Sequence, residues 1–560
     1  MARSLDLVFL WHMHQPDYRA PGHGDFTLPW TYLHAMKDYA DMAAHFERHP
    51  EVRAVVNFVP VLLDQIEDYA TQIARRELRD PLLRLLAHPR PEALDIHERR
   101  HALAICFRAH RLHAIDPFPA YQRLHAMQEL ATAQSSDSIA WLSGAYFADL
   151  VTWYHLAWTG EATRRALPLV AELMSKGEGY THADRLALLD AIGELLQGLL
   201  PRYRALAARG QIELSTTPHA HPIAPLLLSF DAAREAVPDL VLPLSPCYPG
   251  GRERLDLHLT RACDSHRARF GAPAAGLWPA EGAVSTAALA RFAAHGVGWA
   301  ASGETVLAHT LGADRYVRER DLYRPWHDAS GVTMFFRDDR LSDLIGFEYA
   351  KWHGRDAARH FITELEGILA RTPDDATPLV SVILDGENAW EYYPYNAYWF
   401  FEDLYAELAA HPQIRTTTLA DALAGHAAHT GMLPPLVAGS WVYGTLTTWI
   451  GDPDKNHAWD LLCSAKQHYD LVLGSGRLDA AARAKAEAQL AICEGSDWFW
   501  WLGDCNPADS VASFEALFRR HLRALYDALG LAPPAQLDRP LSVGGGHAEV
   551  GGTMRRSQEA

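Results

Sequence analysis

Seven short runs of apolar residues, rich in β-branched and aromatic side chains, recur along this chain and constrain its fold more than any other feature. The runs are Leu5–Trp11, Val52–Val59, Ile212–Thr216, Ala275–Trp278, Val297–Ala301, Val332–Arg337 and Leu379–Leu384. Each ends near a polar residue or a Gly/Pro signal, and helical stretches separate them. This alternation favours βα units and a parallel sheet, so we predict an α/β fold. The 560 residues would suit roughly two to four domains, but one α/β barrel with insertions can absorb most of them.

The alternation is interrupted twice, and these interruptions suggest how the chain is divided. Residues 64–209 have helical spacing and stop signals without a convincing strand, so we expect a helical insertion there. From about residue 431 the chain becomes helical again. We therefore predict a catalytic barrel over 1–430, a helical C-terminal region over 431–535 and a flexible tail over 536–560. The tail contains too few apolar residues to offset its ordering entropy.

The charge balance and the cysteines exclude several classes of protein. The chain carries 69 Asp and Glu against 51 Lys and Arg, a formal charge of −18, and has no basic stripe, so we expect no nucleic-acid partner. No apolar run approaches the roughly 18 residues of a membrane span, and Leu7–Trp11 is too short for a signal-peptide core. Six scattered cysteines form no CxxC pair. We interpret them as reduced thiols of a cytoplasmic protein.

Two carboxylates stand directly after apolar runs, and we expect them to carry the chemistry. Glu281 lies in LWPAEGAVS and Asp385 lies in VSVILDGENAWEYY, and a glycine follows each acid. Barrel and open-sheet enzymes place their reactive groups at strand ends, and glycoside hydrolysis needs two carboxylates facing one cleft. An acid after a strand can also be a helix cap or a loop ion pair, so neither residue decides the function alone.

Aromatic residues are abundant near the polar strand ends. The chain has 17 Trp, 21 Tyr and 19 Phe. Aromatic faces pack against the apolar faces of sugar rings, although most Trp residues in any protein belong to the core. We expect Trp278 and Trp441 to be the ones that touch a ligand, because each stands beside a motif on a turn.

Two His-x-His pairs follow strand candidates. His12 and His14 form one pair, and His219 and His221 form the other. Period-two alternation places both imidazoles of a pair on one face of an extended segment, which is compatible with a metal site. A zinc hydrolase also needs a converging carboxylate and an open position, and spacing alone does not provide these. We therefore expect hydrogen-bonding histidines, with no metal and no cofactor.

Five motifs now combine in a fixed order. They are HMHQP at 12–16, GQIEL with TTPHAHPI at 210–223, LWPAEGAVS at 277–285, ILDGENAW at 383–390 and TTWIGDPDKNHAW at 447–459, followed by EGSDWFWWLGD at 494–504. In order and spacing this set resembles the five sequence regions of glycoside hydrolase family 57. The resemblance spans almost the whole chain. The HQP form of the first motif is most similar to α-amylase and amylopullulanase members.

The resemblance implies an irregular (β/α)7 barrel followed by a helical region that closes the cleft. It implies a retaining mechanism on α-1,4 glucans such as starch, glycogen or maltodextrin, with Glu281 as nucleophile and Asp385 as general acid/base, and it leaves action on α-1,6 bonds open. We expect the substrate to be bound by residues of the matching motifs: His12, His14, Gln15, Glu213, His221, Trp278, Trp390, Trp441, Trp449, Asp452, His457 and Asp504. Glu213 could also fix an imidazole tautomer of His12 or His14.

Three alternatives stay open at this stage. The first is a 4-α-glucanotransferase on the same substrates, because hydrolase and transferase differ only in what intercepts the glycosyl–enzyme. The second is a metal-dependent barrel hydrolase in which His12, His14, His219 and His221 gather zinc. The third is a catalytically silent glucan-binding protein, which the presence of both Glu281 and Asp385 disfavours. The sequence leaves the oligomeric state and the preference between linkages open.

Overall fold

The computed structural model describes residues 3–22, 24–133, 136–373, 375–546 and 552–557. All seven predicted strands are present and form one barrel. They are β1 (Leu5–Met13), β2 (Ala54–Phe58), β3 (Ile212–Thr216), β4 (Gly276–Leu277), β5 (Trp299–Gly303), β7 (Thr333–Arg337) and β8 (Leu379–Asp385). Neighbours pair in parallel in the order β1-β2-β3-β4-β5-β7-β8, and β8 pairs again with β1 to close the barrel. The α/β prediction and the (β/α)7 barrel are confirmed.

The period-two alternation of β1 explains how reactive side chains reach the inside of the barrel. Val8 and Leu10 belong to a buried cluster that fills the barrel interior, together with Val55 of β2 and Ile383 of β8. His12 continues the same row at the carboxyl end of β1, since alternate side chains share a face. In the β1–β8 register, His12 stands opposite Asp385. The strand ends therefore bring an imidazole and a carboxyl to one rim.

Three very short strands were not predicted from the sequence. They are β6 (Trp326–His327), β9 (Ile414–Thr416) and β10 (Gly431–Met432). β9 pairs with the beginning of β1, and β6 pairs with β7 and β10. Unlike β4, which lies within a longer apolar run, these short strands carry too little periodicity to be recognised.

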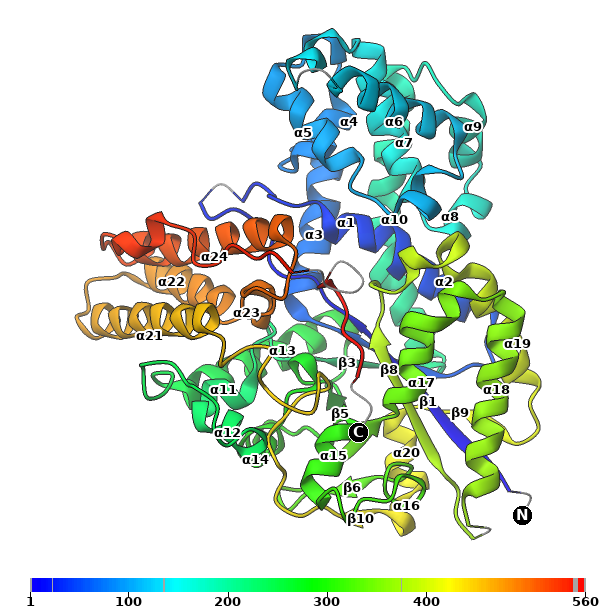
Figure 1. Cartoon of the computed structure of the whole chain (residues 1–560), viewed down its shortest axis with the longest axis vertical. Helices are drawn as coiled ribbons and strands as arrows, with labels where there is room; N and C mark the ends of the chain where they lie inside the picture. Colours follow the sequence, from blue (N-terminus) through cyan, green and yellow to red (C-terminus); the bar gives the residue numbers. More distant parts are fainter. Residues whose placement is uncertain (1–2, 23, 134–135, 374, 547–551, 558–560) are drawn as a thin grey trace.

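Helices follow most barrel strands and cover the outside of the sheet (Figure 1). They are α1 (Trp30–His34), α2 (Ala40–Arg48), α11 (Ala224–Leu228), α12 (Ala233–Ala236), α13 (Gly251–Phe270), α14 (Thr286–Ala294), α15 (Glu304–Leu311), α16 (Arg318–Asp321), α17 (Asp339–Asp343), α18 (Gly354–Arg371), α19 (Tyr398–Ala410) and α20 (Leu419–Gly425).

The region between β2 and β3 is helical wherever the structure describes it. Its helices are α3 (Pro60–Arg75), α4 (Pro81–Ala87), α5 (Ile96–Cys106), α6 (Pro119–Thr132), α7 (Gly144–Ala157), α8 (Glu161–Ala166), α9 (Pro168–Lys176) and α10 (His182–Ala208). Most of them rise above the barrel in Figure 1, as expected for an insertion into a βα repeat.

A second helical group follows β10. It consists of α21 (Pro453–Gly474), α22 (Ala480–Cys493), α23 (Ser496–Trp501) and α24 (Ala508–Ala528). α24 packs against α21, α22 and α23. No helix among the described residues is long and apolar enough to cross a membrane.

The end of the chain differs from the expected flexible tail where the structure describes it. Leu541 and Ser542 are buried, and residues 552–557 run back along the barrel toward α17 (Figure 1). Met554 is buried as well. The stretch was expected to be loose because it has few apolar residues, but polar contacts to side chains of the barrel hold it in place, as described below. Residues 547–551 and 558–560 lie outside the described part.

Candidate active site

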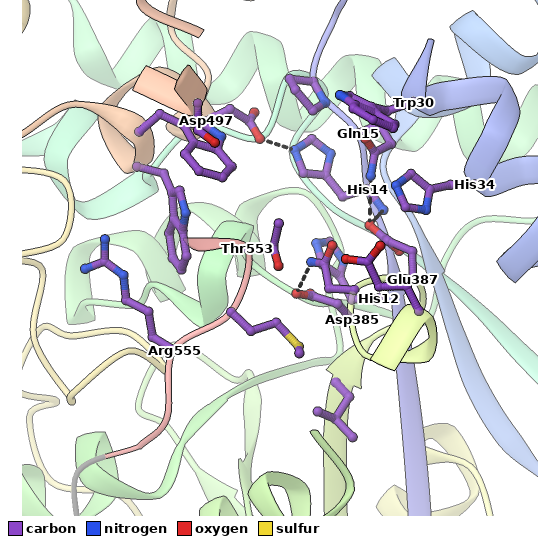
Figure 2. Close-up of a pocket in the computed structure, with 18 of the residues that line it drawn as sticks. His12, His14, Gln15, Trp30, His34, Asp385, Glu387, Asp497, Thr553 and Arg555 are labelled. Carbon is purple, nitrogen blue, oxygen red and sulfur yellow. Dashed lines mark hydrogen bonds and ion pairs between the residues drawn. The ribbon is translucent and has the colours of Figure 1, made fainter. Parts of the chain in front are cut away.

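A cavity of about 440 Å³ opens at the carboxyl ends of β1 and β8. Its walls combine distant parts of the chain. β1 and β8 contribute His12 and Asp385, the helical insertion contributes Arg108, and α23 contributes Asp497. Figure 2 shows Asp497 reaching across the cavity to His14. Both helical groups therefore complete a site whose floor is the barrel.

Glu281 lies on a tight turn directly after β4, and its backbone is strained. Its φ is 58° and ψ is 24°, in the left-handed region that non-glycine residues rarely occupy. Gly282 follows with φ 57°, and a Cβ there would approach the Trp278 ring to 2.8 Å. The Ser302 hydroxyl on β5 donates to the Gly282 carbonyl at 2.6 Å, and the backbone N–H of Trp441 donates to the Glu281 carbonyl at 3.1 Å. The surrounding structure thus fixes a conformation that aims Glu281 into the cavity.

Two opposing effects act on the Glu281 carboxyl. The Trp441 indole N–H donates to Oε2 at 3.0 Å, which stabilises the ionised form. Burial and the nearby Asp385 charge act more strongly in the other direction and raise the pKa of Glu281 to about 8.

Asp385, the last residue of β8, shares this environment. Burial raises its pKa to about 6, while the Asn388 amide, which donates to Oδ2 at 2.8 Å, and the charges of His14 and Arg337 act to lower it. Glu281 and Asp385 are electrostatically coupled across the cavity. Coupled carboxyls of this kind titrate as a pair, so one proton is retained by the two groups between these pKa values.

A third acid, Glu387, lines the same cavity and was not among the predicted residues. It is 2% exposed, and burial raises its pKa well above the usual value. Its Oε1 accepts hydrogen bonds from the Gln15 side-chain amide at 3.3 Å and from the backbone N–H of His14 at 3.4 Å. Its Oε2 has no hydrogen-bond partner within the described chain. Glu387 is therefore a buried carboxyl whose surroundings favour the neutral form, and one of its oxygens is available to a ligand.

Three histidines form a stacked group on the wall beside these acids. The His14 and His221 ring centroids are 3.8 Å apart, and His12 and His221 are 5.2 Å apart. Burial lowers the pKa of His12 to about 3 and that of His221 well below its usual value, so both are neutral at pH 7. Like Glu281, His221 has a left-handed backbone, with φ 60°.

The hydrogen bonds of this group fix the tautomers. His12 Nδ1–H donates to Asn57 Oδ1 at 2.7 Å, which leaves Nε2 as an acceptor 3.2 Å from His221 Nε2. His14 Nε2 lies 2.8 Å from an Asp497 carboxylate oxygen and donates to it. The His14 Nδ1 atom is buried without a hydrogen-bond partner among the described residues. It is therefore available for a hydrogen bond with a ligand hydroxyl.

Some of the same residues also offer ligand atoms for a metal. His14, His221 and Asp497 offer donor atoms within 4.8 Å of one another. His219 is not part of this group, because its Nε2 lies 3.4 Å from Asp64 at another place on the surface. The four-histidine zinc site considered from the sequence is therefore wrong. His14 is held by Asp497, and the Ser496 hydroxyl lies 2.8 Å from His221 Nδ1, so hydrogen bonding accounts for both rings.

Comparison with known proteins identifies the family. The sequence model of Glycosyl hydrolase family 57 matches residues 8–434, which include both buried acids and the HMHQP motif. The chain belongs to glycosyl hydrolase family 57. It is accordingly an enzyme of the glycoside hydrolase and transferase class.

Solved structures support the same fold. A family 57 branching enzyme from Thermococcus kodakaraensis, in complex with glucose, is 15% identical, with a TM-score of 0.58 over 94% of this chain and 90% of that one. The α-amylase AmyC of Thermotoga maritima is 14% identical, with a TM-score of 0.55 over 94% of each chain. The 4-α-glucanotransferase of Thermococcus litoralis is 14% identical, with a TM-score of 0.50 over 94% of this chain and 60% of that one. At these identities the likeness shows the fold alone.

Seven of the predicted site residues of this family 57 enzyme line the cavity. They are His12, His14, Gln15, His221, Glu281, Asp385 and Trp441. Gln15 accepts a hydrogen bond from Tyr18 at 2.8 Å, which orients its amide toward Glu387. The motifs at 12–16, 277–285 and 383–390 therefore converge.

The prediction that Glu213 binds substrate is wrong, because the structure places this residue away from the cavity. It is the second residue of β3, so it lies toward the amino end of that strand, at the opposite rim of the barrel. Its carboxylate accepts hydrogen bonds from the Trp299 indole at 2.7 Å and from the Ala420 N–H at 2.8 Å. It thereby fixes the beginning of α20. The tautomers that it was expected to set are fixed by Asn57, Asp497 and Ser496 instead.

Three predicted tryptophans belong to the core rather than to the cavity wall. Trp278 is fully buried and packs edge-on against Trp441, with ring centroids 5.2 Å apart, so it supports the wall from behind. Trp390 donates to the Gly386 carbonyl at 2.7 Å. Trp449 is fully buried and packs against Trp500.

Three further predicted residues are also not part of the wall. Asp452 is the N-cap of α21, where its carboxylate accepts the Asp454 N–H at 2.8 Å. His457 and Asp504 are exposed to solvent. Asp452 therefore serves as a helix cap, and none of the three residues lines the cavity.

Sequence reasoning missed a larger part of the wall. The missed residues are Tyr18, Trp30, His34, Arg108, His110, Trp158, Arg337, Phe347, Glu387, Asn388, Glu391, Tyr392, Asp497, Trp500, Trp501, Phe514, Thr553, Met554, Arg555 and Ser557. Glu387 and Asp497 stand inside quoted motifs, two residues after Asp385 and within EGSDWFWW, and could have been found there. Residues of the insertion and the chain end carry no comparable signal.

Proposed function

We propose that this family 57 enzyme is a retaining glycoside hydrolase acting on α-1,4 glucans such as starch, glycogen or maltodextrin. The observation that carries the proposal is the buried pair Glu281 and Asp385, coupled across one cavity, with an indole N–H donated to Glu281. A retaining glycosidase needs one ionised and one protonated carboxyl on opposite sides of the scissile bond.

In the proposed reaction, Asp385 gives its proton to the glycosidic oxygen while a Glu281 oxygen bonds to the anomeric carbon and the glycosidic bond breaks. Asp385, now ionised, then takes a proton from water, whose oxygen displaces Glu281. In the free protein burial raises the pKa of both carboxyls. Substrate binding must therefore leave the shared proton on Asp385, where the glycosidic oxygen offers an acceptor, and the Trp441 N–H favours the ionised Glu281 that results.

The cavity walls suit a glucose chain. Glu387 Oε2 and His14 Nδ1 are buried polar atoms without partners in the described chain, and sugar hydroxyls would satisfy both. Trp30, Tyr392 and Trp441 line the same space and offer ring faces to pyranose rings. The branching enzyme, α-amylase and glucanotransferase of similar fold support α-glucans as the substrate class.

The domain division is a proposal as well. We propose that residues 1–430 form the catalytic unit and that residues 431–535 close its cleft. The contributions of α23 and α24 to the cavity wall, Asp497, Trp500 and Phe514 among them, support this division.

The function is tested with purified protein, maltoheptaose and pullulan, with products separated by chromatography. Shorter maltooligosaccharides that are absent with Glu281→Gln would support hydrolysis of α-1,4 bonds, and maltotriose from pullulan would add α-1,6 activity. Chains longer than maltoheptaose would replace hydrolysis by 4-α-glucan transfer. The absence of any product from both substrates would refute the proposal.

The proposed roles of Glu281 as nucleophile and Asp385 as general acid/base are tested separately by azide rescue with α-maltosyl fluoride. Removing a nucleophile leaves room for azide on its face and yields the β-glycosyl azide, whereas removing the acid/base lets azide attack the glycosyl–enzyme and yields the α-glycosyl azide. We expect the β product from Glu281→Ala and the α product from Asp385→Ala. The opposite pattern would exchange the two roles.

A further inference from the structure

The described end of the chain, residues 552–557, forms part of the active-site wall. We call this segment the C-terminal strap. Thr553, Met554, Arg555 and Ser557 line the cavity that also contains Glu281. Figure 2 shows Thr553 between the Asp497 side and Asp385, and Arg555 farther along the same segment.

The strap is anchored at its beginning to the C-terminal helical group. The Trp500 indole N–H donates to the Gly552 carbonyl at 2.8 Å. Gly552 has φ +87°, and a Cβ at this position would lie 3.1 Å from the Trp501 ring and 3.2 Å from Asn506 Oδ1. The close approach to α23 therefore requires a glycine. Met554 is only 7% exposed, so the strap is packed against the protein on this side.

The other end of the strap is anchored to the barrel. Ser557 Oγ accepts a hydrogen bond from Arg337 at 3.0 Å, and the Ser557 N–H donates to Asp343 at 2.8 Å. Arg337 also stacks over the Trp441 ring at 5.5 Å, and Trp441 holds the Glu281 carboxylate. The strap thus joins a connected set of side chains that ends at Glu281.

Arg555 brings a positive charge into this arrangement. Its guanidinium stacks on Trp500 at 4.7 Å, and Nη2 lies 3.4 Å from the Cys505 sulfur. No ion pair of Arg555 with a carboxylate is found among the described residues, so its charge remains available to the cavity. That charge acts to lower the pKa of Glu281. The adjacent Arg556 pairs with Glu348 at 2.6 Å and does not line the cavity.

We infer that the C-terminal strap is a built part of the glucan site, and that Arg555 is a positioning residue whose charge acts on Glu281 from the same cavity wall. This inference takes the substrate from the proposed function. The geometry of the strap comes from the contacts that anchor it at both ends. A cation that shares a cavity with a buried carboxyl favours its charged form, and a wall anchored at both ends keeps that cation in place. The strap therefore belongs to the catalytic arrangement although it lies about 270 residues from Glu281 in sequence.

The first test reads the ionisation of Glu281 without substrate. The indole ¹H–¹⁵N resonance of Trp441, assigned by its loss in Trp441→Phe, reports the hydrogen-bonded carboxyl during a pH titration. We expect Arg555→Gln to move the titration midpoint upward by about half a pH unit or more. The matched variant Arg556→Gln removes a neighbouring cation outside the cavity and should leave the midpoint where it is. An unchanged midpoint in Arg555→Gln would overturn the role of Arg555.

The second test measures kcat/KM on maltoheptaose for a chain ending at residue 551 and for Arg555→Gln. We expect a loss of at least about 30-fold for the shortened chain and about 10-fold for Arg555→Gln, with the acidic limb of the pH profile moved to higher pH. Activity equal to or above that of the full chain in a folded shortened protein would overturn the inference and make the strap an obstacle to substrate. If the shortened chain does not fold, Arg555→Gln and the titration still decide. A full chain that cleaves no α-glucan would refute the proposed function and leave the titration result valid.

Discussion

Trp441→Phe tests the electrostatics of the proposed nucleophile most sharply. The substitution removes the indole N–H that donates to Glu281 Oε2 at 3.0 Å. It keeps an aromatic ring that can pack edge-on against Trp278, as Trp441 does at an interplanar angle of 72°. The change therefore deletes one hydrogen bond to a carboxylate and little else.

The expected size follows from the strength of that bond. A hydrogen bond to a charged group contributes about 1.5 to 3 kcal/mol, which corresponds to roughly 10-fold to 150-fold in kcat/KM if the bond acts on the reactive carboxylate. The bond stabilises ionised Glu281, so its loss raises the pKa of Glu281 further above the usual value. A smaller fraction of Glu281 is then ionised below neutral pH. We expect the acidic limb of kcat/KM to move upward by about one pH unit.

The assay is the pH dependence of kcat/KM on maltoheptaose between pH 4 and 9. Trp326→Phe is the matched control, because the Trp326 indole N–H is also buried and donates to the Asp321 carbonyl at 2.8 Å, away from the cavity. It should leave the acidic limb in place. A Trp441→Phe profile that matches the original protein within twofold, with no displaced limb, would refute the reasoning.

Three further predictions concern Glu387, Glu213 and treatment with a chelator. Glu387→Gln should keep kcat/KM within about fivefold, because burial favours the neutral carboxyl, whereas Glu387→Ala should lose about 10-fold to 100-fold; a large loss in the Gln variant would show that a charge is needed. Glu213→Ala should lower the free energy of unfolding by about 2 to 4 kcal/mol in denaturant titrations, because the Trp299 indole and the Ala420 N–H lose their acceptor, while kcat/KM stays within twofold; a loss of activity without a loss of stability would contradict this. Dialysis against EDTA should leave activity on maltoheptaose unchanged, because His14 and His221 are held by hydrogen bonds; inactivation restored by zinc would favour a metal site instead.

The barrel was predictable because its strands are continuous apolar runs between helices. All seven were located from the sequence, and the two acids were recognised because each directly follows such a run. Period-two alternation then fixes which side chains face inward, as for His12 on β1. Local pattern was sufficient wherever the functional residue lies at the carboxyl end of a strand.

Glu213 shows where local pattern misleads. It lies in a family motif next to an apolar run, but at the beginning of its strand, and the two ends of a parallel strand face opposite rims of the barrel. Asp452 is similar, because a motif acid can serve as a helix cap. Whether a motif acid reaches the cavity depends on its position within the strand or helix, and the composition of the motif does not give that position.

The wall opposite the barrel could not be predicted because it depends on contacts between remote segments. His14 meets Asp497 across 483 positions, and Arg337 meets Ser557 across 220. The strap carries few apolar residues, so its composition indicated a loose tail. Its order comes from hydrogen bonds to particular side chains, which no local periodicity encodes.

The central claim is that Glu281 and Asp385 act as a retaining pair on α-glucans. The most direct test follows the anomeric protons by NMR during the first minutes of maltoheptaose cleavage, before mutarotation. The account predicts that the α-anomer of the new reducing end appears first and that Glu281→Gln produces no signal. Early appearance of the β-anomer would mean inversion and would contradict the account.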